Sequence, residues 1–197
     1  MTKRLFDLCA AGVGLLLLCP LLLGVALAIW LTDGRPVFFR QLRVGRGGVD
    51  FWLYKFRTMT VVREAERGSF DAGSTRRVTT IGRLLRKTKL DELPQLWNVL
   101  RGEMSLVGPR PEVRQWVAAY PERWAGVLTV RPGITDPASI AYRNEEELLA
   151  AAPDPERCYR EEILPRKLAL YEDYVQRHGL ARDLRLIFET FWVVVRG

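Results

Sequence analysis

Histidine and cysteine are scarce in this chain of 197 residues. His178 is the only histidine, so a zinc site or a serine–histidine triad has few side chains from which to form. Two of the three cysteines, Cys9 and Cys19, lie in an apolar segment, and Cys158 lies far from them. This spacing provides neither a disulfide framework nor a metal cluster, and it favours a reducing, cytoplasmic setting.

Acidic residues are in the minority. The chain has 23 Asp and Glu against 30 Lys and Arg, which gives a net charge of +7. Expected partners are therefore anionic: phosphorylated substrates, lipid headgroups or nucleic acid. Because no recognised nucleic-acid-binding motif is present, nucleic acid is not an expected partner.

A long apolar segment lies near the N-terminus. From Leu8 to Leu31 the chain has 24 residues without a charge. As a helix this segment would be about 36 Å long, against a hydrocarbon core of about 30 Å. It is too long for the apolar part of a signal peptide, and residues 29–33 lack the small side chains of a cleavage site. We expect the segment to be retained in a membrane.

Basic residues flank this segment on both sides, as expected where both flanks lie at the cytoplasmic face. Lys3 and Arg4 precede it, and the basic residues that follow are Arg35, Arg40, Arg43 and Arg46. Cys19 and Pro20 lie at its midpoint, where proline removes a backbone donor and bends a helix. The sequence therefore predicts a re-entrant helix-break-helix with the break at Cys19 and Pro20. A single-span anchor with a proline kink is the alternative.

A β-hairpin is predicted after the apolar segment. Residues 37–44 and 51–57 have the composition of strands, and the turn between them contains Gly45, Gly47 and Gly48. Lys55 and Arg57 are two residues apart and would share one face of the second strand. Two cations on one face can bind a diphosphate, although a solvated basic strand face is the alternative.

Helical periodicity marks three further segments. Residues 81–86 predict a short basic amphipathic helix, which includes Arg86 and suits an anionic membrane surface. Residues 163–175 predict a second helix, and a wide apolar stripe from Asp183 onward predicts a third. That stripe fits core packing and membrane contact equally well. Residues 62–77 are polar and predict a loop.

Two adjacent carboxylates, Asp91 and Glu92, lie among basic residues. Their cationic neighbours in the sequence are Arg83, Arg86, Lys87, Lys89 and Arg101. The pattern from Thr88 to Asp91 matches a capping box, and Pro94 suits a first helical turn, so the pair is expected to mark a helix N-terminus. The helix dipole favours acidic residues there without any catalytic role. The same dipole and the cations would keep Asp91 ionised, as a carboxylate nucleophile or metal ligand requires.

Two arginines lie in conformationally restricted turns. Arg110 lies between Pro109 and Pro111, and the second proline biases it towards an extended conformation. Arg131 begins an Arg-Pro-Gly turn. A planar guanidinium is well suited to binding phosphate oxygens, so both are candidate ligands, although a single arginine is more often a surface residue.

Several blocks of the sequence resemble a known family. Lys55 to Met59, Leu90 to Pro111 and Arg131 to Thr135 are similar to the signature blocks of the bacterial sugar transferase family, the monotopic phosphoglycosyl transferases. The opening residues 3–7 and the membrane hairpin resemble the same family. The resemblance covers essentially the whole chain and indicates the minimal form of the family.

The resemblance implies a reaction with two anionic substrates. A nucleoside diphosphate sugar, with a UDP-sugar as the expected donor, would give its sugar phosphate to polyprenyl phosphate and so initiate glycoconjugate or polysaccharide assembly. Asp91 would be the nucleophile that forms an aspartyl-phosphosugar, and Asp91 and Glu92 would hold Mg²⁺. The candidate phosphate ligands are Lys55, Arg57, Arg86, Arg110 and Arg131.

The predicted fold is mixed α/β and mostly helical. It comprises the re-entrant hairpin at residues 1–33, amphipathic interfacial helices, a small β-hairpin, and one catalytic domain over residues 34–197. The catalytic domain would face the cytoplasm from the bacterial inner membrane and contact its phospholipids, with a homodimer left open. A non-enzymatic basic membrane module and a membrane pyrophosphate hydrolase are the alternative functions.

Three places depart from the family pattern. Cys19 stands where a serine is usual before the hairpin proline, and Tyr171 stands where an aspartate is common. After Thr135 the chain continues with Asp-Pro-Ala-Ser at residues 136–139 in place of Gly-Trp-Ala-Gln. Recognition of the donor sugar is therefore expected to differ from that of better-known members.

Overall fold

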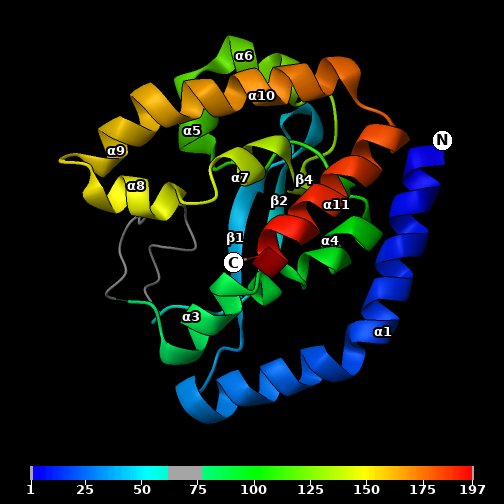
Figure 1. The fold of residues 1–197 in the computed structure, drawn as a ribbon, viewed down its shortest axis with the longest axis vertical. Helices are drawn as coiled ribbons and strands as arrows, with labels where there is room; N and C mark the ends of the chain where they lie inside the picture. The colour runs from blue at the N-terminus through cyan, green and yellow to red at the C-terminus, as the bar shows by residue number, and fades with distance from the viewer. Residues whose placement is uncertain (1, 62–76, 197) are drawn as a thin grey trace.

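The computed structural model of the protein describes residues 2–61 and 77–196, with side chains up to residue 193. Nearly all of the predicted polar loop, residues 62–77, falls outside these ranges. The described chain is mostly helical, with one long apolar N-terminal helix and a small antiparallel hairpin, as the sequence predicts (Figure 1).

The apolar segment forms a single helix, α1 (Thr2–Asp33), with Pro20 inside it. Its ribbon turns sharply partway along, so that α1 has two arms (Figure 1). The predicted break is therefore a bend within a continuous helix, because a proline removes one backbone hydrogen bond and distorts the preceding turn without ending the helix. Many apolar side chains of α1 are exposed, including Leu16, Leu17 and Leu23. Among the described residues, α1 is the one helix long and apolar enough to cross a membrane.

The predicted β-hairpin is confirmed. Strands β1 (Phe38–Val44) and β2 (Asp50–Phe56) pair antiparallel along their whole length, from Phe38 opposite Phe56 to Val44 opposite Asp50. The 3₁₀ turn η1 (Arg46–Gly48) joins them, and Gly47 and Gly48 have φ angles of 69° and 78°. Only glycine adopts this left-handed region without a steric penalty, so the glycines fix the turn.

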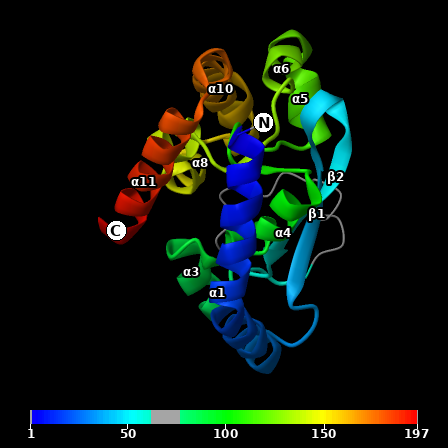
Figure 2. The ribbon, with the colours of Figure 1, turned by 90° about the vertical axis from the view of Figure 1, so that its right-hand side faces the viewer.

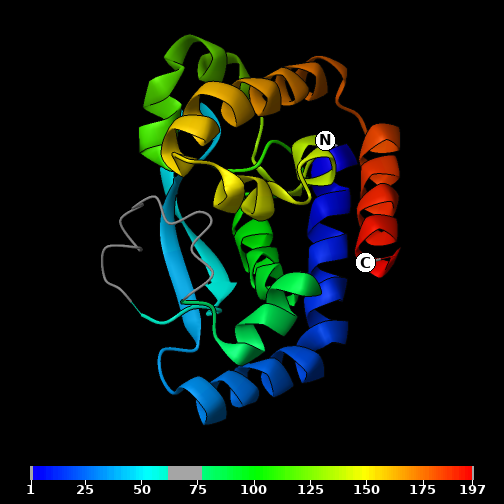
Figure 3. The same ribbon diagram turned by 60° about the vertical axis from the view of Figure 1, so that its left-hand side comes forward.

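The middle of the chain forms helix α3 (Thr80–Lys87), the 3₁₀ turn η2 (Leu90–Glu92) and helix α4 (Gln95–Arg101). Helix α4 lies between the β-hairpin and the N-terminal arm of α1 (Figure 3). Two short strands, β3 (Ser105–Val107) and β4 (Gly133–Thr135), then pair in parallel. This arrangement puts η2 at the N-terminal end of α4.

The predicted capping box at Thr88 is wrong. The Thr88 hydroxyl donates to the carbonyl oxygens of Leu84 at 2.8 Å and Leu85 at 3.2 Å, so Thr88 ends α3 and does not begin the next helix. Lys89 then reverses the chain with a φ angle of 56°. The pattern from Thr88 to Asp91 is compatible with the end of one helix as well as with the start of the next. Here the Thr88 side chain donates its hydrogen bonds to carbonyls of the preceding helix.

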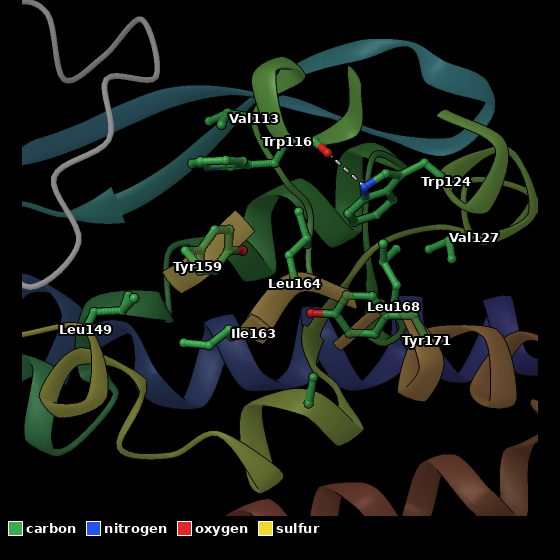
Figure 4. Packing of buried hydrophobic residues seen from close by; sticks show 11 residues of the cluster. Val113, Trp116, Trp124, Val127, Leu149, Tyr159, Ile163, Leu164, Leu168 and Tyr171 are labelled. Atoms are coloured by element: carbon green, nitrogen blue, oxygen red, sulfur yellow. Dashed lines mark hydrogen bonds between the residues drawn. The ribbon is translucent and has the colours of Figure 1, made fainter. Parts of the chain in front are cut away.

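Most of the C-terminal half packs around an aromatic core. This half comprises α5 (Arg114–Ala119), α6 (Pro121–Val127), α7 (Pro137–Ala141), α8 (Glu145–Ala151), α9 (Pro155–Cys158), the short π-helix η3 (Tyr159–Ile163), α10 (Leu164–Arg177) and α11 (Leu180–Arg196). Figure 4 shows Trp116, Trp124 and Tyr171 gathered around Leu164 and Leu168. The Trp124 indole N–H donates to the Trp116 carbonyl oxygen at 3.1 Å, which satisfies its one polar atom inside the core.

Helix α11 divides its apolar stripe between core and surface. Leu186 is buried against Val107 and Tyr174, whereas Leu184, Phe188, Phe191 and Trp192 are exposed. Figure 2 shows α11 on the side of the molecule away from the β-hairpin. The stripe therefore serves packing on one side and leaves an aromatic surface on the other.

Candidate active site

Asp91 and Glu92 lie in η2, the short turn between α3 and α4, and both are buried. The turn packs against β2 and α3, which brings the pair beside Lys55. The turn comes directly before α4, so the pair marks the start of this helix as predicted, and contacts with separate elements complete the site.

Glu92 is the acceptor for two cations. Lys55 Nζ donates to Oε1 at 2.8 Å, and Arg110 Nη2 donates to the same oxygen. Arg110 Nη1 lies 3.4 Å from Oε2. Burial raises the pKa of Glu92, but the charges and hydrogen bonds of Arg110 and Lys55 outweigh burial and hold that pKa well below its usual value. Glu92 thus remains ionised and fixes both cations in place.

Asp91 has a different environment. Its Oδ1 atom is buried without a hydrogen-bond partner in the described chain. Burial raises the pKa of Asp91 and the charge of Glu92 adds to the effect, while Lys55, Lys89 and Arg110 oppose it. The three cations favour the ionised carboxylate, but burial outweighs them, because the hydrogen bonds of Lys55 and Arg110 go to Glu92. A poorly solvated carboxylate oxygen with no donor is available to bind a metal or to attack an electrophile.

The turn that carries Arg110 is held at both ends. Arg43 on β1 donates to the Pro111 carbonyl at 3.0 Å and to Glu112 Oε2 at 3.1 Å. On the other side, the Gly133 N–H donates to the Pro109 carbonyl at 3.0 Å. The proline-constrained arginine is thus anchored to both small sheets, and its ion pair with Glu92 raises the pKa of Arg110.

Asn98 is a positioning residue that the sequence analysis missed. It is fully buried in α4; its amide donates to the Trp52 carbonyl at 2.7 Å, and its Oδ1 accepts from the Tyr54 N–H at 3.2 Å. These bonds fix β2 against α4, and hence Lys55 against Glu92. An asparagine within the apolar run of α4 was the available signal, because a buried amide must find partners.

Three predicted phosphate ligands bind groups other than Asp91 and Glu92. Arg57 is buried, and its Nη2 donates to the carbonyls of Asp33 at 2.7 Å and Gly34 at 3.0 Å, at the end of α1. Arg86 pairs with Glu146 of α8. Arg131 donates from Nε to the Gly102 carbonyl at 2.8 Å, at the opposite end of α4 from Asp91. The structure thus brings Lys55, Arg110, Asp91 and Glu92 together and gives these three arginines partners outside that group, so their phosphate-binding roles stay predictions.

The carboxylate pair fits a magnesium ion with few protein ligands. Across residues 2–61 and 77–196 no group of three or more His, Cys, Asp or Glu side chains could hold a metal. Mg²⁺, however, commonly binds one or two carboxylates and takes its other ligands from water and substrate phosphates. The unpartnered Oδ1 of Asp91 is the available protein ligand, because Glu92 already binds two cations.

A long apolar helix beside a buried carboxylate–cation site defines a membrane-associated protein equipped to handle an anionic substrate. The bacterial sugar transferase family matches residues 1–197, and the chain belongs to this family. The family resemblance of the sequence is thereby confirmed, and the protein is a sugar transferase.

Curated relatives match nearly the whole chain. The UDP-glucose:undecaprenyl-phosphate glucose-1-phosphate transferase of Caulobacter vibrioides is 39% identical over 96% of this chain and 68% of its own length. The exopolysaccharide production protein ExoY of Rhizobium meliloti is 38% identical, over 96% of this chain and 84% of its own. The UDP-N-acetylgalactosamine-undecaprenyl-phosphate N-acetylgalactosaminephosphotransferase of Aeromonas hydrophila is 36% identical over 99% of this chain, which spans 44% of that relative.

Proposed function

We propose that this protein transfers a sugar 1-phosphate from a nucleoside diphosphate sugar to polyprenyl phosphate at the cytoplasmic membrane face. The names of the relatives support a UDP-sugar as donor and undecaprenyl phosphate as acceptor. The product would be the lipid-linked sugar that starts an exopolysaccharide or related glycoconjugate. The unpartnered Oδ1 of Asp91 beside the Lys55 and Arg110 cations is the observation that carries the proposal.

The reaction proceeds in two displacements. An Asp91 carboxylate oxygen attacks the sugar-bearing phosphorus, the bond to the bridging oxygen breaks, and the nucleoside monophosphate leaves with the electron pair. A phosphate oxygen of the polyprenyl phosphate then attacks the phosphorus of the aspartyl-phosphosugar. The second displacement forms the lipid diphosphate sugar and returns Asp91 as a carboxylate.

Lys55 and Arg110 bind and orient the phosphate oxygens during both displacements. Glu92 holds the two cations close together, so their positive charge is already in place when negative charge develops on the phosphoryl oxygens. Bound at Asp91 with the substrate oxygens, Mg²⁺ would neutralise the diphosphate, which otherwise repels the carboxylate.

The re-entrant topology is supported by contacts at the two ends of α1. Near its start, Arg4 donates to the Val99 carbonyl of α4 at 2.8 Å. At its end, the carbonyls of Asp33 and Gly34 accept from Arg57. Since both ends bind one folded body, a span with its ends on opposite sides of a bilayer would break one set of contacts. A cysteine at Thr2 should thus be protected from a membrane-impermeant thiol reagent in intact cells.

Exposed apolar surface supports contact with phospholipids. Leu16, Leu17 and Leu23 are exposed on α1, and the exposed aromatic side of α11 includes Phe188 and Phe191. Exposed apolar area of this extent is characteristic of surfaces that contact lipid or protein. We propose that α1 enters the bilayer while the carboxylate site stays at its cytoplasmic boundary, where a soluble donor meets a lipid acceptor.

The decisive experiment traps the intermediate. Purified protein is incubated with Mg²⁺ and a UDP-sugar labelled in the sugar, without acceptor, and the bound label is located by mass spectrometry. Label should be found on Asp91 together with released UMP, and the Asp91→Asn variant should give neither. Asp50→Asn, which alters a carboxylate paired with Arg114, is the matched control and should be labelled like the wild type.

The same assay separates the proposal from hydrolysis of a membrane diphosphate. A hydrolase would release product without a sugar-phosphate adduct and without forming a lipid-linked sugar when acceptor is added. Label on another side chain, or full turnover by Asp91→Asn, would refute the assignment of Asp91. Membership of the sugar transferase family disfavours the non-enzymatic basic module.

A further inference from the structure

A basic pocket lies away from the carboxylate site. Its volume is about 390 Å³, and α1, the hairpin turn, β3, the segment before β4 and the end of α10 all contribute to its walls. The charged side chains that line it are Lys3, Arg4, Asp7, Arg46 and Arg131. A volume of this size accommodates a small ligand or a lipid headgroup.

The pocket and the carboxylate site occupy opposite ends of α4. Asp91 lies just before the helix, whereas Arg4 and Arg131 bind carbonyls at its C-terminal end, Arg4 that of Val99 and Arg131 that of Gly102. The seven residues of α4 span about 10 Å. Neither Asp91 nor Glu92 lines the pocket, so the two sites are separate.

The pocket carries excess positive charge. Its four cations face two carboxylates, Asp7 in the wall and Asp183, which pairs with Lys3. Burial lowers the pKa of Arg131, and the neighbouring charges of Arg4 and Arg46 lower it further. Asp7 is itself occupied, because it accepts from the Ser105 hydroxyl at 2.9 Å and the Leu106 N–H at 3.2 Å.

Hydrogen bonds to the end of α4 account for the positions of only some of these cations. Arg4 and Arg131 interact with the C-terminal carbonyls of α4, as basic side chains often do. Arg46 is exposed on the hairpin turn, and the described chain offers its side chain no hydrogen bond or ion pair. A cation that faces other cations across a pocket is stabilised when an anion binds between them.

We propose that this pocket binds a phosphate group. Guanidinium groups are the preferred side chains for phosphate oxygens, and Arg46 and Arg131 supply two of them from different walls. Lys3 and Arg4 also lie a few residues before the apolar segment, and basic residues beside a membrane segment attract the headgroups of an anionic leaflet. The phosphate can therefore belong to an anionic phospholipid or be free in solution.

Calorimetric titration of the purified full-length protein in a neutral detergent tests the proposal. One series uses inorganic phosphate, a second uses short-chain phosphatidylglycerol, and short-chain phosphatidylcholine is the zwitterionic control. A preference for phosphatidylglycerol over both other probes identifies the headgroup as the source. Binding of inorganic phosphate without preference for phosphatidylglycerol identifies a free phosphate group. No binding of any probe overturns the proposal.

Three variants locate the binding. Arg46→Glu should weaken it about tenfold or more, since a charged hydrogen-bond donor is replaced by a repelling carboxylate. Arg166→Glu makes the same change at an exposed position of α10 outside the pocket and should bind like the wild type. Arg110→Ala should retain the binding. Equal affinity for Arg46→Glu and wild type, or loss only in Arg110→Ala, would place the phosphate outside the pocket and refute the proposal.

Discussion

Lys55 and Arg110 donate hydrogen bonds to the same carboxylate oxygen, Oε1 of Glu92. Lys55 comes from β2 and Arg110 from the turn after β3, so Glu92 joins two parts of the fold at the carboxylate site. Two cations this close repel each other unless an anion lies between them. Glu92 therefore holds the two cations together, whereas Asp91 has an oxygen without a hydrogen-bond partner, and the catalytic and metal-binding roles of both carboxylates stay predictions.

Replacing Glu92 with glutamine should destabilise the protein. The variant leaves two partly buried cations without an anionic partner, which costs about 2–3 kcal/mol of unfolding free energy, or roughly 5–10 °C in Tm. Thermal unfolding in detergent, followed by circular dichroism, measures the loss. Glu172→Gln is the matched control, because its pair with Arg123 is more exposed and should contribute less than about 1 kcal/mol.

The contribution of Glu92 to the stability of the fold should depend on pH. Its pKa is depressed in the folded protein, so its stabilisation is present above the ordinary value of 4.5 and is lost as the pH falls below it. The Tm difference between wild type and Glu92→Gln should be constant near neutral pH and narrow below about pH 4.5. A difference that stays constant into acid would show that the ion pairs do not stabilise the fold.

Replacing Asp91 with asparagine should have the opposite effect on stability. Because the pKa of Asp91 is raised on folding, its ionised form destabilises the folded state at neutral pH. The variant should gain roughly 1 kcal/mol, or about 2–4 °C in Tm, while losing activity. The gain should shrink as the pH falls through the raised pKa towards the ordinary value of 3.8, because the wild type then becomes neutral too. A lower Tm at neutral pH would contradict this account.

The sequence predicted the elements that have a regular pattern. Two segments of strand-like composition on either side of a glycine-containing turn predicted the hairpin of Phe38–Val44 and Asp50–Phe56. Helical spacing of apolar residues predicted α10 and α11. The paired strands Ser105–Val107 and Gly133–Thr135 could not be predicted, because three residues show no period. Their contact depends on backbone proximity, since a Cβ on Gly133 would lie 2.1 Å from the Gly108 nitrogen.

Within the site, residue types were predictable and their partners were not. Asp91, Glu92 and Arg110 were selected by charge and turn chemistry and Lys55 by its place on a strand, and the structure brings the four together. Arg57 was selected by the two-residue period of a strand, but β2 ends at Phe56 and that period no longer applies. Glu92 binds two cations, whereas Oδ1 of Asp91 has no hydrogen-bond partner. This difference depends on tertiary contacts that no local sequence pattern encodes.

Arg57→Met tests whether this arginine binds α1 or a substrate. Its two hydrogen bonds to the carbonyls of Asp33 and Gly34 predict a loss of about 1.5–3 kcal/mol in unfolding free energy, because those buried contacts have no substitute. The KM for the donor, measured on the folded fraction, should stay near that of the wild type. A large rise in KM with an unchanged Tm would instead support the phosphate-binding role.

Gly82→Ala tests how closely α3 must approach the segment that follows β2. A Cβ at Gly82 would lie 2.1 Å from the Thr58 carbonyl oxygen, so α3 must shift, at a cost of about 1–3 kcal/mol. Since η2 follows α3 directly, activity should fall as well. Gly126→Ala in α6 is the matched control: its Cβ would meet nothing within 4 Å, and it should stabilise the protein by up to about 1 kcal/mol. Equal Tm values for the two variants would contradict the close packing.

Lys55→Met should change both the rate of sugar-phosphate transfer and its dependence on pH. The variant removes a cation that orients the phosphoryl oxygens, so kcat should fall by about 10²-fold. It also removes a charge that lowers the pKa of Asp91, so the acidic limb of the pH–rate profile should move to higher pH. Lys87→Met removes an exposed lysine from α3 and should leave the profile unchanged. A reduced kcat with an unshifted acidic limb would mean that Lys55 acts on the substrate alone, and that its charge does not control the ionisation of Asp91.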